Sequence, residues 1–137
     1  MPKKLLFVVT EDWYFVSHRL ALAVAAKAAG YDVSVATRVS EHASAIETAG
    51  IRLVPFSLSR RMGNPLAEVR ALVRLYKQEK PDLVHHVAMK PVIYGGIAAR
   101  VAGVPAWVNA IAGLGWLYSS RTDLLQYARP FVRKMLA

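Results

Sequence analysis

The chain has 137 residues, of which 55% are hydrophobic and 20% are charged, and it contains 8 Gly, 7 Pro and no Cys. This length and composition fit one globular domain and exclude a disordered, collagen-like or coiled-coil protein, a disulfide framework, a thiolate nucleophile and sulfur-ligated zinc. The 18 Lys and Arg residues outnumber the 9 Asp and Glu residues, so the formal net charge is +9 and the expected partner is acidic, such as a phosphate or an anionic membrane surface.

Short apolar runs alternate with helical patterns along the chain. The runs are rich in β-branched residues, as expected of strands buried on both faces, and they comprise residues 5–9, 33–36, 51–56, 83–87 and 107–111. Between them, apolar residues keep helical spacing over 20–28 and 66–76. Alternating β and α elements with right-handed crossovers predict a doubly wound α/β domain, with a five-stranded parallel sheet in the order 3-2-1-4-5 and helices on both faces.

The segment after the first strand, residues 10–19, is long and aromatic. It is predicted as a loop that leads into a helix capped by Ser17. Its residues Trp13, Tyr14 and Phe15 either contact a ligand or lipid, or fold back onto the sheet.

Two further segments bear on membrane association. The apolar run 5–9 follows two lysines, as in a signal peptide, but it ends before Glu11 and no cleavage site follows, so a first strand and a cytoplasmic protein are predicted. Residues 101–120 carry no charge, but their glycines and Pro105 would interrupt a membrane-spanning helix.

The last residues, 122–137, have an amphipathic pattern. One apolar face includes Phe131, while Arg129, Arg133 and Lys134 lie largely elsewhere around the helix. The pattern predicts a C-terminal helix at an anionic membrane surface, at the inner face of the plasma membrane, or else an ordinary helix that covers the sheet or a second domain.

Ligands of doubly wound sheets bind outside the carboxyl ends of the strands. The stretches that follow the predicted strands contain six basic residues, Arg19, Arg38, Arg60, Arg61, Lys90 and Arg121. Together with helix N-termini they favour an anionic ligand, although polar loops in a basic protein are the alternative. Arg19 and Lys90 each stand at a helix start, so they are expected to hold one phosphate jointly, and Arg60 and Asn64 are further candidate contacts, Asn64 also being a predicted N-cap.

Several common site motifs are missing. Neither a P-loop nor a dinucleotide fingerprint occurs, since Gly113-Leu114-Gly115 lacks the third glycine, and no serine lies in Gly-X-Ser-X-Gly. No helix-turn-helix or base-stacking pattern accompanies the positive charge, so nucleic acid is not an expected partner.

Four histidines are candidates for acid or base chemistry. His85 and His86 are adjacent on a predicted strand and point to opposite faces, so they cannot share a metal ion, and no metal is expected. His18 and His86 are the candidate bases, the alternative being buried, hydrogen-bonded histidines. His42 is predicted to be solvated.

An ordered set of motifs resembles the family-4 glycosyltransferases over essentially the whole chain. The motifs are Ser17-His18-Arg19-Leu20, Gly30-Tyr31-Asp32-Val33, Pro81-Asp82-Leu83-Val84-His85-His86, Lys90-Pro91, Tyr94-Gly95, Ala98-Ala99-Arg100, Ala102-Gly103-Val104-Pro105 and Gly113-Leu114-Gly115. More narrowly, the chain is similar to the N-terminal, acceptor-side domain of bacterial enzymes that transfer a sugar from a nucleotide sugar to a lipid-linked or polysaccharide acceptor.

The resemblance implies a GT-B architecture of two doubly wound domains, with metal-independent hexosyl or N-acetylhexosaminyl transfer and no cofactor beyond the donor substrate. Relatives bind the nucleotide sugar mostly in the C-terminal domain, through a Glu-X7-Glu motif that this chain lacks. Residues 1–137 are therefore expected to form the N-terminal domain alone, inactive without a missing C-terminal domain or a partner chain.

The resemblance also assigns residues. His18 and Arg19 would lie at the acceptor and donor-phosphate side of the cleft, His85 and Lys90 would line its floor, and Gly113 and Gly115 would form the tight turn of the floor. Many relatives place a histidine just before that turn, where this chain has Ala112. His18 and His86 are then substitutes for the base, while cations stabilise the departing nucleotide diphosphate.

Two other readings stay open. One is a non-catalytic subunit that binds the acceptor and recruits a separate donor-binding chain to the membrane. The other is an unrelated nucleotide-binding or regulatory α/β domain.

Overall fold

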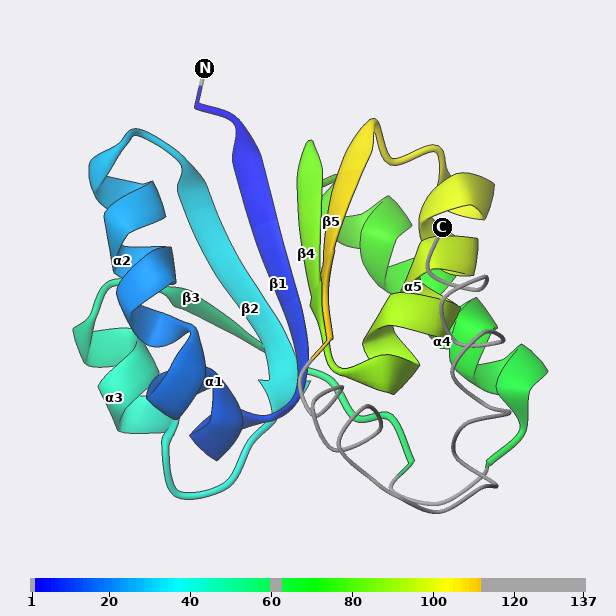
Figure 1. Cartoon of the computed structure of the whole chain (residues 1–137), viewed down its shortest axis with the longest axis horizontal. Coiled ribbons are helices and arrows are strands. Elements are labelled where there is room, and N and C mark those ends of the chain that lie inside the picture. Colours follow the sequence, from blue (N-terminus) through cyan, green and yellow to red (C-terminus); the bar gives the residue numbers. More distant parts are fainter. Residues whose placement is uncertain (1, 60–62, 112–137) are drawn as a thin grey trace, which may run out of the picture.

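A parallel sheet organises the protein in the computed structural model, which describes residues 2–59 and 63–111. Its strands are β1 (Lys4–Glu11), β2 (Asp32–Arg38), β3 (Arg52–Pro55), β4 (Leu83–Val87) and β5 (Ala106–Ala110). They pair in the order β3-β2-β1-β4-β5, and every pair is parallel (Figure 1). The predicted five-stranded sheet and its order are confirmed.

Helices cover both faces of this sheet, as predicted. One face carries α1 (Asp12–His18), α2 (Leu20–Ala28) and α3 (Ala43–Thr48), and the other carries α4 (Pro65–Glu79) and α5 (Met89–Ala102) (Figure 1). The predicted C-terminal amphipathic helix falls in residues 112–137, which lie outside the described residues. None of the helices in the described ranges combines the length and apolar character needed to cross a bilayer.

Both faces are buried because β1 alternates its side chains between two apolar clusters. Leu6 and Val8 pack into the cluster beneath α4 and α5. Leu5, Phe7 and Val9 pack into the cluster beneath α1 and α2. This double burial explains why the strands appear in the sequence as continuous apolar runs rather than alternating ones.

The segment after β1 differs from the predicted loop. Residues 12–18 form the short helix α1, and Ser17 lies inside it rather than capping the next helix, which begins after Arg19. Phe15 turns into the core and meets Phe7 edge to face, with ring centroids 5.4 Å apart. Phe15 therefore folds back onto the sheet, whereas Trp13 stays 49% exposed.

A buried polar network joins α4, β4 and β5. The hydroxyl of Tyr76 donates to Nε2 of His86 over 2.7 Å, and Nδ1 of His86 donates to Oδ1 of Asn109 over 2.9 Å. Gly95 of α5 leaves room for this network, since a Cβ there would lie 2.4 Å from Cδ2 and 2.5 Å from Nε2 of His86. The neighbouring Gly96 faces open space.

These two adjacent glycines should respond to alanine in opposite ways. We expect Gly95→Ala to lower the free energy of unfolding by about 1–3 kcal/mol, because the rigid ring of His86 must move. Gly96→Ala should raise it by about 0.5–1 kcal/mol, since alanine is the better helix former and meets no neighbour. Urea unfolding of both variants measures the difference, and equal effects would contradict the tight packing at Gly95.

Candidate functional site

The carboxyl ends of β1 and β2 and the segment after β4 surround a depression of about 280 Å³. We call it the edge pocket, and its lining residues are Thr10, Glu11, Arg38, Leu58, Ser59, Ala88 and Lys90. It lies where the strand order reverses on either side of β1, the position at which doubly wound sheets bind ligands.

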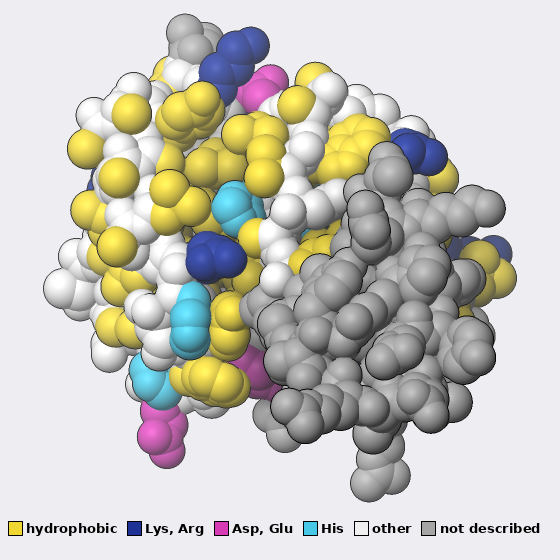
Figure 2. Space-filling view, in the orientation of Figure 1, with side chains coloured by type: hydrophobic (Ala, Val, Ile, Leu, Met, Phe, Trp, Pro, Cys, Tyr) yellow, Lys and Arg dark blue, Asp and Glu magenta, His cyan; other side chains and the backbone are white. Residues whose placement is uncertain are grey.

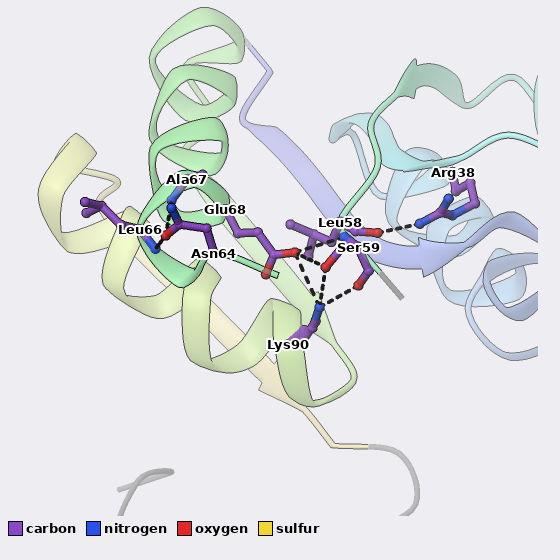
Figure 3. Close-up of polar contacts among 8 residues, drawn as sticks. All are labelled: Arg38, Leu58, Ser59, Asn64, Leu66, Ala67, Glu68 and Lys90. Atoms are coloured by element: carbon purple, nitrogen blue, oxygen red, sulfur yellow. Dashed lines mark hydrogen bonds and ion pairs between the residues drawn. The ribbon is translucent and has the colours of Figure 1, made fainter. Parts of the chain in front are cut away.

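Lys90, in the first turn of α5, turns toward the segment that joins β3 to α4 (Figure 3). Its ammonium group donates to Oγ of Ser59 over 3.0 Å and to the Ser59 carbonyl oxygen. It also lies 3.4 Å from Oε1 of Glu68, on the first turn of α4. The carboxylate partner of Lys90 is thus Glu68, whereas sequence considerations offered only Glu11 and Asp12.

Glu68 accepts three hydrogen bonds on one oxygen although it is only 9% exposed. Its Oε1 accepts from the Ser59 N–H over 2.9 Å, from the Ser59 hydroxyl over 2.6 Å and from Lys90. Burial by itself would raise the pKa of Glu68, but the bonds from Ser59 and the charge of Lys90 hold that pKa below its usual value. Glu68 is therefore ionised at neutral pH.

Arg38 forms the opposite wall of the edge pocket. Its Nε lies 3.4 Å from Oε1 of Glu11, and its Nη2 donates to the carbonyl oxygen of Leu58 (Figure 3). Both cations of the pocket thus have a carboxylate beside them, which mixes donors and acceptors around the depression.

Asp12 anchors the same edge from the β1–α1 junction. Its fully buried carboxylate accepts from the N–H and hydroxyl of Ser40, at 2.7 Å and 2.6 Å, and from the N–H of His42 at 3.1 Å. Burial alone would raise the pKa of Asp12, but these bonds hold it below its usual value. Asp12 fixes the β2–α3 segment and is not a partner of Arg19.

Ala88 also lines the pocket, in a backbone conformation (φ 79°, ψ 168°) that is almost confined to glycine. Strain of this kind persists only where the surroundings impose it. Here the Ala88 N–H donates to the carbonyl oxygen of Ala110 over 3.0 Å, which turns the chain from β4 into the helix that carries Lys90.

The structure does not bring Arg19 and Lys90 together. Arg19 lies between α1 and α2 and acts electrostatically on His85, whose ring stacks on Phe7 beneath those helices with centroids 4.9 Å apart. Lys90 lies on the side of α4 and α5. The expectation that the two hold one phosphate jointly is therefore wrong.

The predicted bases occupy contrasting places. His18 is exposed at the end of α1 and stacks on Tyr14, with ring centroids 4.1 Å apart. His86 is fully buried, and both of its ring nitrogens are engaged by Tyr76 and Asn109, so it cannot reach a substrate hydroxyl. His86 corresponds to the alternative of a buried, hydrogen-bonded histidine.

The remaining predicted site residues divide into two groups. Asn64 uses its Oδ1 to cap α4, accepting from the N–H groups of Leu66 and Ala67 at 3.0 Å and 3.4 Å. The others lie outside the described residues, and they are Arg60, Gly113, Gly115, Arg129, Phe131, Arg133 and Lys134.

Sequence considerations missed Thr10, Glu11, Ser59 and Glu68 as parts of this edge. Glu68 in particular has an ordinary explanation, since an acidic residue in the first turn of a helix is favourable by itself. Within residues 2–59 and 63–111, no cluster of three or more His, Asp or Glu side chains could hold a metal ion.

Comparison with known proteins gives three kinds of match. Residues 4–137 match the family described as Glycosyl transferase 4-like. Over 62 residues the chain is 39% identical to a UDP-Gal:alpha-D-GlcNAc-diphosphoundecaprenol alpha-1,3-galactosyltransferase from Escherichia coli, a match that covers 43% of this chain and 16% of that relative.

Solved structures share the fold. A glycosyltransferase from Rickettsia africae matches with a TM-score of 0.62 at 14% identity, over 79% of this chain and 29% of that one. MurG from Acinetobacter baumannii matches with a TM-score of 0.61 at 23% identity, over 82% and 37%. A UDP-N-acetylglucosamine 2-epimerase matches with a TM-score of 0.66 at 16% identity, over 99% and 39%.

The buried state of His86 should make stability depend on pH. Burial lowers the pKa of His86 to about 4, whereas an unfolded histidine titrates near 6.5, so protons favour the unfolded state as the pH falls below 6.5. From about pH 7.5 to about pH 5 this loss amounts to roughly 2 kcal/mol of unfolding free energy.

Urea unfolding at both pH values measures this loss. His86→Gln, which removes the titrating group, should flatten the dependence by about that amount, roughly 2 kcal/mol. His18→Gln is the control at an exposed histidine. An undiminished dependence in His86→Gln would contradict a neutral, buried His86.

Proposed function

Because the chain belongs to the Glycosyl transferase 4-like family, we propose that it is the N-terminal, acceptor-side domain of an enzyme that transfers a sugar from a nucleotide sugar to a lipid-linked or polysaccharide acceptor. The observation that carries this proposal is the edge pocket, where hydroxyl, carboxylate and cationic groups gather at the ligand-binding edge of the sheet. The family match argues against an unrelated regulatory domain.

The pocket suits part of a saccharide acceptor. At about 280 Å³ it is near the lower limit of ligand pockets. Its mixed donors and acceptors match the hydroxyl groups of a sugar, while Lys90 and Arg38 can each approach an anionic oxygen. The E. coli relative takes a GlcNAc-diphosphoundecaprenol acceptor by its name, which supports a lipid-linked acceptor here.

In the proposed reaction an acceptor hydroxyl oxygen attacks the anomeric carbon of the donor, and the bond from that carbon to the nucleotide diphosphate breaks. His18 is the accessible base for the hydroxyl proton. Arg19, at the same end of α1, stabilises the charge of the departing diphosphate, and His85 lines the site beside it. No metal or cofactor takes part in this scheme.

The donor is proposed to bind to a separate domain, C-terminal in a longer protein or on a partner chain. The chain spans 16% of the length of its curated relative and 29–39% of the solved structures named above. The same observation favours a second candidate, a non-catalytic subunit that holds the acceptor and recruits a donor-binding chain.

The isolated chain should neither bind nor turn over a nucleotide sugar. Titration calorimetry with UDP-galactose and UDP-N-acetylglucosamine is expected to show no binding at micromolar concentrations, because the donor site lies elsewhere. Micromolar binding or sugar transfer by the chain alone would contradict the two-domain proposal. Transfer by the chain together with its donor domain, lost in His18→Ala, would favour the catalytic domain over the non-catalytic subunit.

We also propose that the domain is cytoplasmic and binds peripherally to an anionic membrane. Exposed apolar side chains spread over α1 and α2, including Trp13, Leu22 and Val24 (Figure 2). The sequence 122–137 adds Phe131 and a basic group of residues to the same expectation. Together with the net charge of +9, these features suit a surface that is both apolar and anionic.

Vesicle sedimentation tests the membrane proposal. A variant with Arg129, Arg133 and Lys134 changed to Gln should lose up to about 3 kcal/mol of affinity for vesicles containing phosphatidylglycerol, at about 1 kcal/mol per basic residue. Binding of the unchanged chain should weaken with salt, whereas neutral vesicles serve as the control. Equal binding by both proteins would show that these residues do not face a membrane.

A further inference from the structure

Three separate segments meet at the carboxylate of Glu68: the β3–α4 connection through Ser59, the first turn of α4, and the first turn of α5 through Lys90 (Figure 3). We propose that Glu68 is a positioning residue, which holds the ammonium group of Lys90 at one place on the rim of the edge pocket. This inference rests on the proposed function, because it concerns how Lys90 meets an anionic oxygen of a ligand.

Glu68 differs from an ordinary surface ion pair. Its side chain is 10% exposed and that of Lys90 is 25% exposed, whereas the nearby pair of Arg52 and Glu79 leaves Arg52 60% exposed. Burying a carboxylate is costly unless hydrogen bonds compensate. Three donors converge on Oε1 of Glu68 and provide this compensation.

The backbone is shaped around the same oxygen. A Cβ at Gly63 would lie 2.6 Å from Oγ of Ser59 and 3.3 Å from Oε1 of Glu68. Any side chain at Gly63 would therefore displace the Ser59 hydroxyl from its bond. Only a residue without a side chain allows the chain to pass this close to the cluster.

Lys90 needs such a partner for two reasons. A cation in the first turn of a helix opposes the helix dipole, and Glu68 offsets this with an opposite charge. A lysine side chain also has many rotamers, and ordering it costs conformational entropy on every binding event unless the fold has already ordered it. Glu68 and Ser59 therefore preorganise Lys90 for a ligand that enters the edge pocket.

The sign of one affinity change separates positioning from simple electrostatics. Glu68→Gln removes a negative charge beside the pocket, so electrostatics alone would strengthen the binding of an anion. Loss of positioning would weaken it. In Glu68→Gln the side-chain oxygen can still accept from the Ser59 N–H, so the variant mainly affects Lys90.

The probe is inorganic pyrophosphate, titrated into the whole 137-residue chain and followed by ³¹P NMR. We expect Glu68→Gln to bind it at least about tenfold more weakly, as for one lost charge-assisted hydrogen bond. The matched control is Glu79→Gln, which makes the same charge change on the same helix beside Arg52. Unchanged or tighter binding by Glu68→Gln, with an unchanged melting temperature, would overturn the proposal.

A second measurement does not depend on any ligand. NMR of ¹⁵N-labelled lysine ammonium groups should show a slowly exchanging Lys90 signal that is lost in Glu68→Gln and kept in Glu79→Gln. Lys27, which donates to the Gly50 carbonyl oxygen over 3.0 Å, is the internal reference. A Lys90 signal that is equal in all three proteins would refute positioning. If Glu68→Gln loses the signal but the unchanged chain binds no pyrophosphate, positioning stands and the proposed phosphate contact of Lys90 fails.

Discussion

The parallel pairing of β1 with both β2 and β4 is the constraint on which the candidate site depends. The three strands run in one direction, so they end at one edge, and the crossover connections leave β1 toward opposite sides of the sheet. Glu11, Arg38 and Lys90 therefore meet around one depression although 27 and 52 residues separate them along the chain. Without this pairing the same residues would be scattered over separate loops.

The charge at this edge is arranged more evenly than the net charge of +9 suggests. Arg38 has Glu11 beside it and Lys90 has Glu68, each at 3.4 Å, because a half-buried cation without a counter-charge would lose hydration with nothing in return. The excess positive charge therefore acts at longer range, where it attracts an acidic surface. Close to the ligand, the pocket offers fixed donors and acceptors instead.

Two adjacent histidines of β4 illustrate how one strand serves both the core and the site. His86 turns toward α4 and is held by Tyr76 and Asn109, while His85 turns toward α1 and stacks on Phe7 beside Arg19. Burial lowers the pKa of both, so both favour the neutral ring. The difference lies in their partners, which makes His86 part of the core and leaves His85 at the candidate site.

The sequence by itself determined the sheet, its strand order and the two helical layers, because strands buried on both faces leave continuous apolar runs and right-handed crossovers allow few orders. It also located Arg38 and Lys90 at the ligand edge, since strand ends follow from strand positions. The short helix at Asp12, the inward turn of His86 and the contact of Glu68 with Lys90 were decided only by the tertiary structure. Local patterns do not record which partner a side chain meets: Asp12 depends on Ser40, 28 residues away, and Glu68 reaches Lys90, 22 residues away, only because α4 packs against α5.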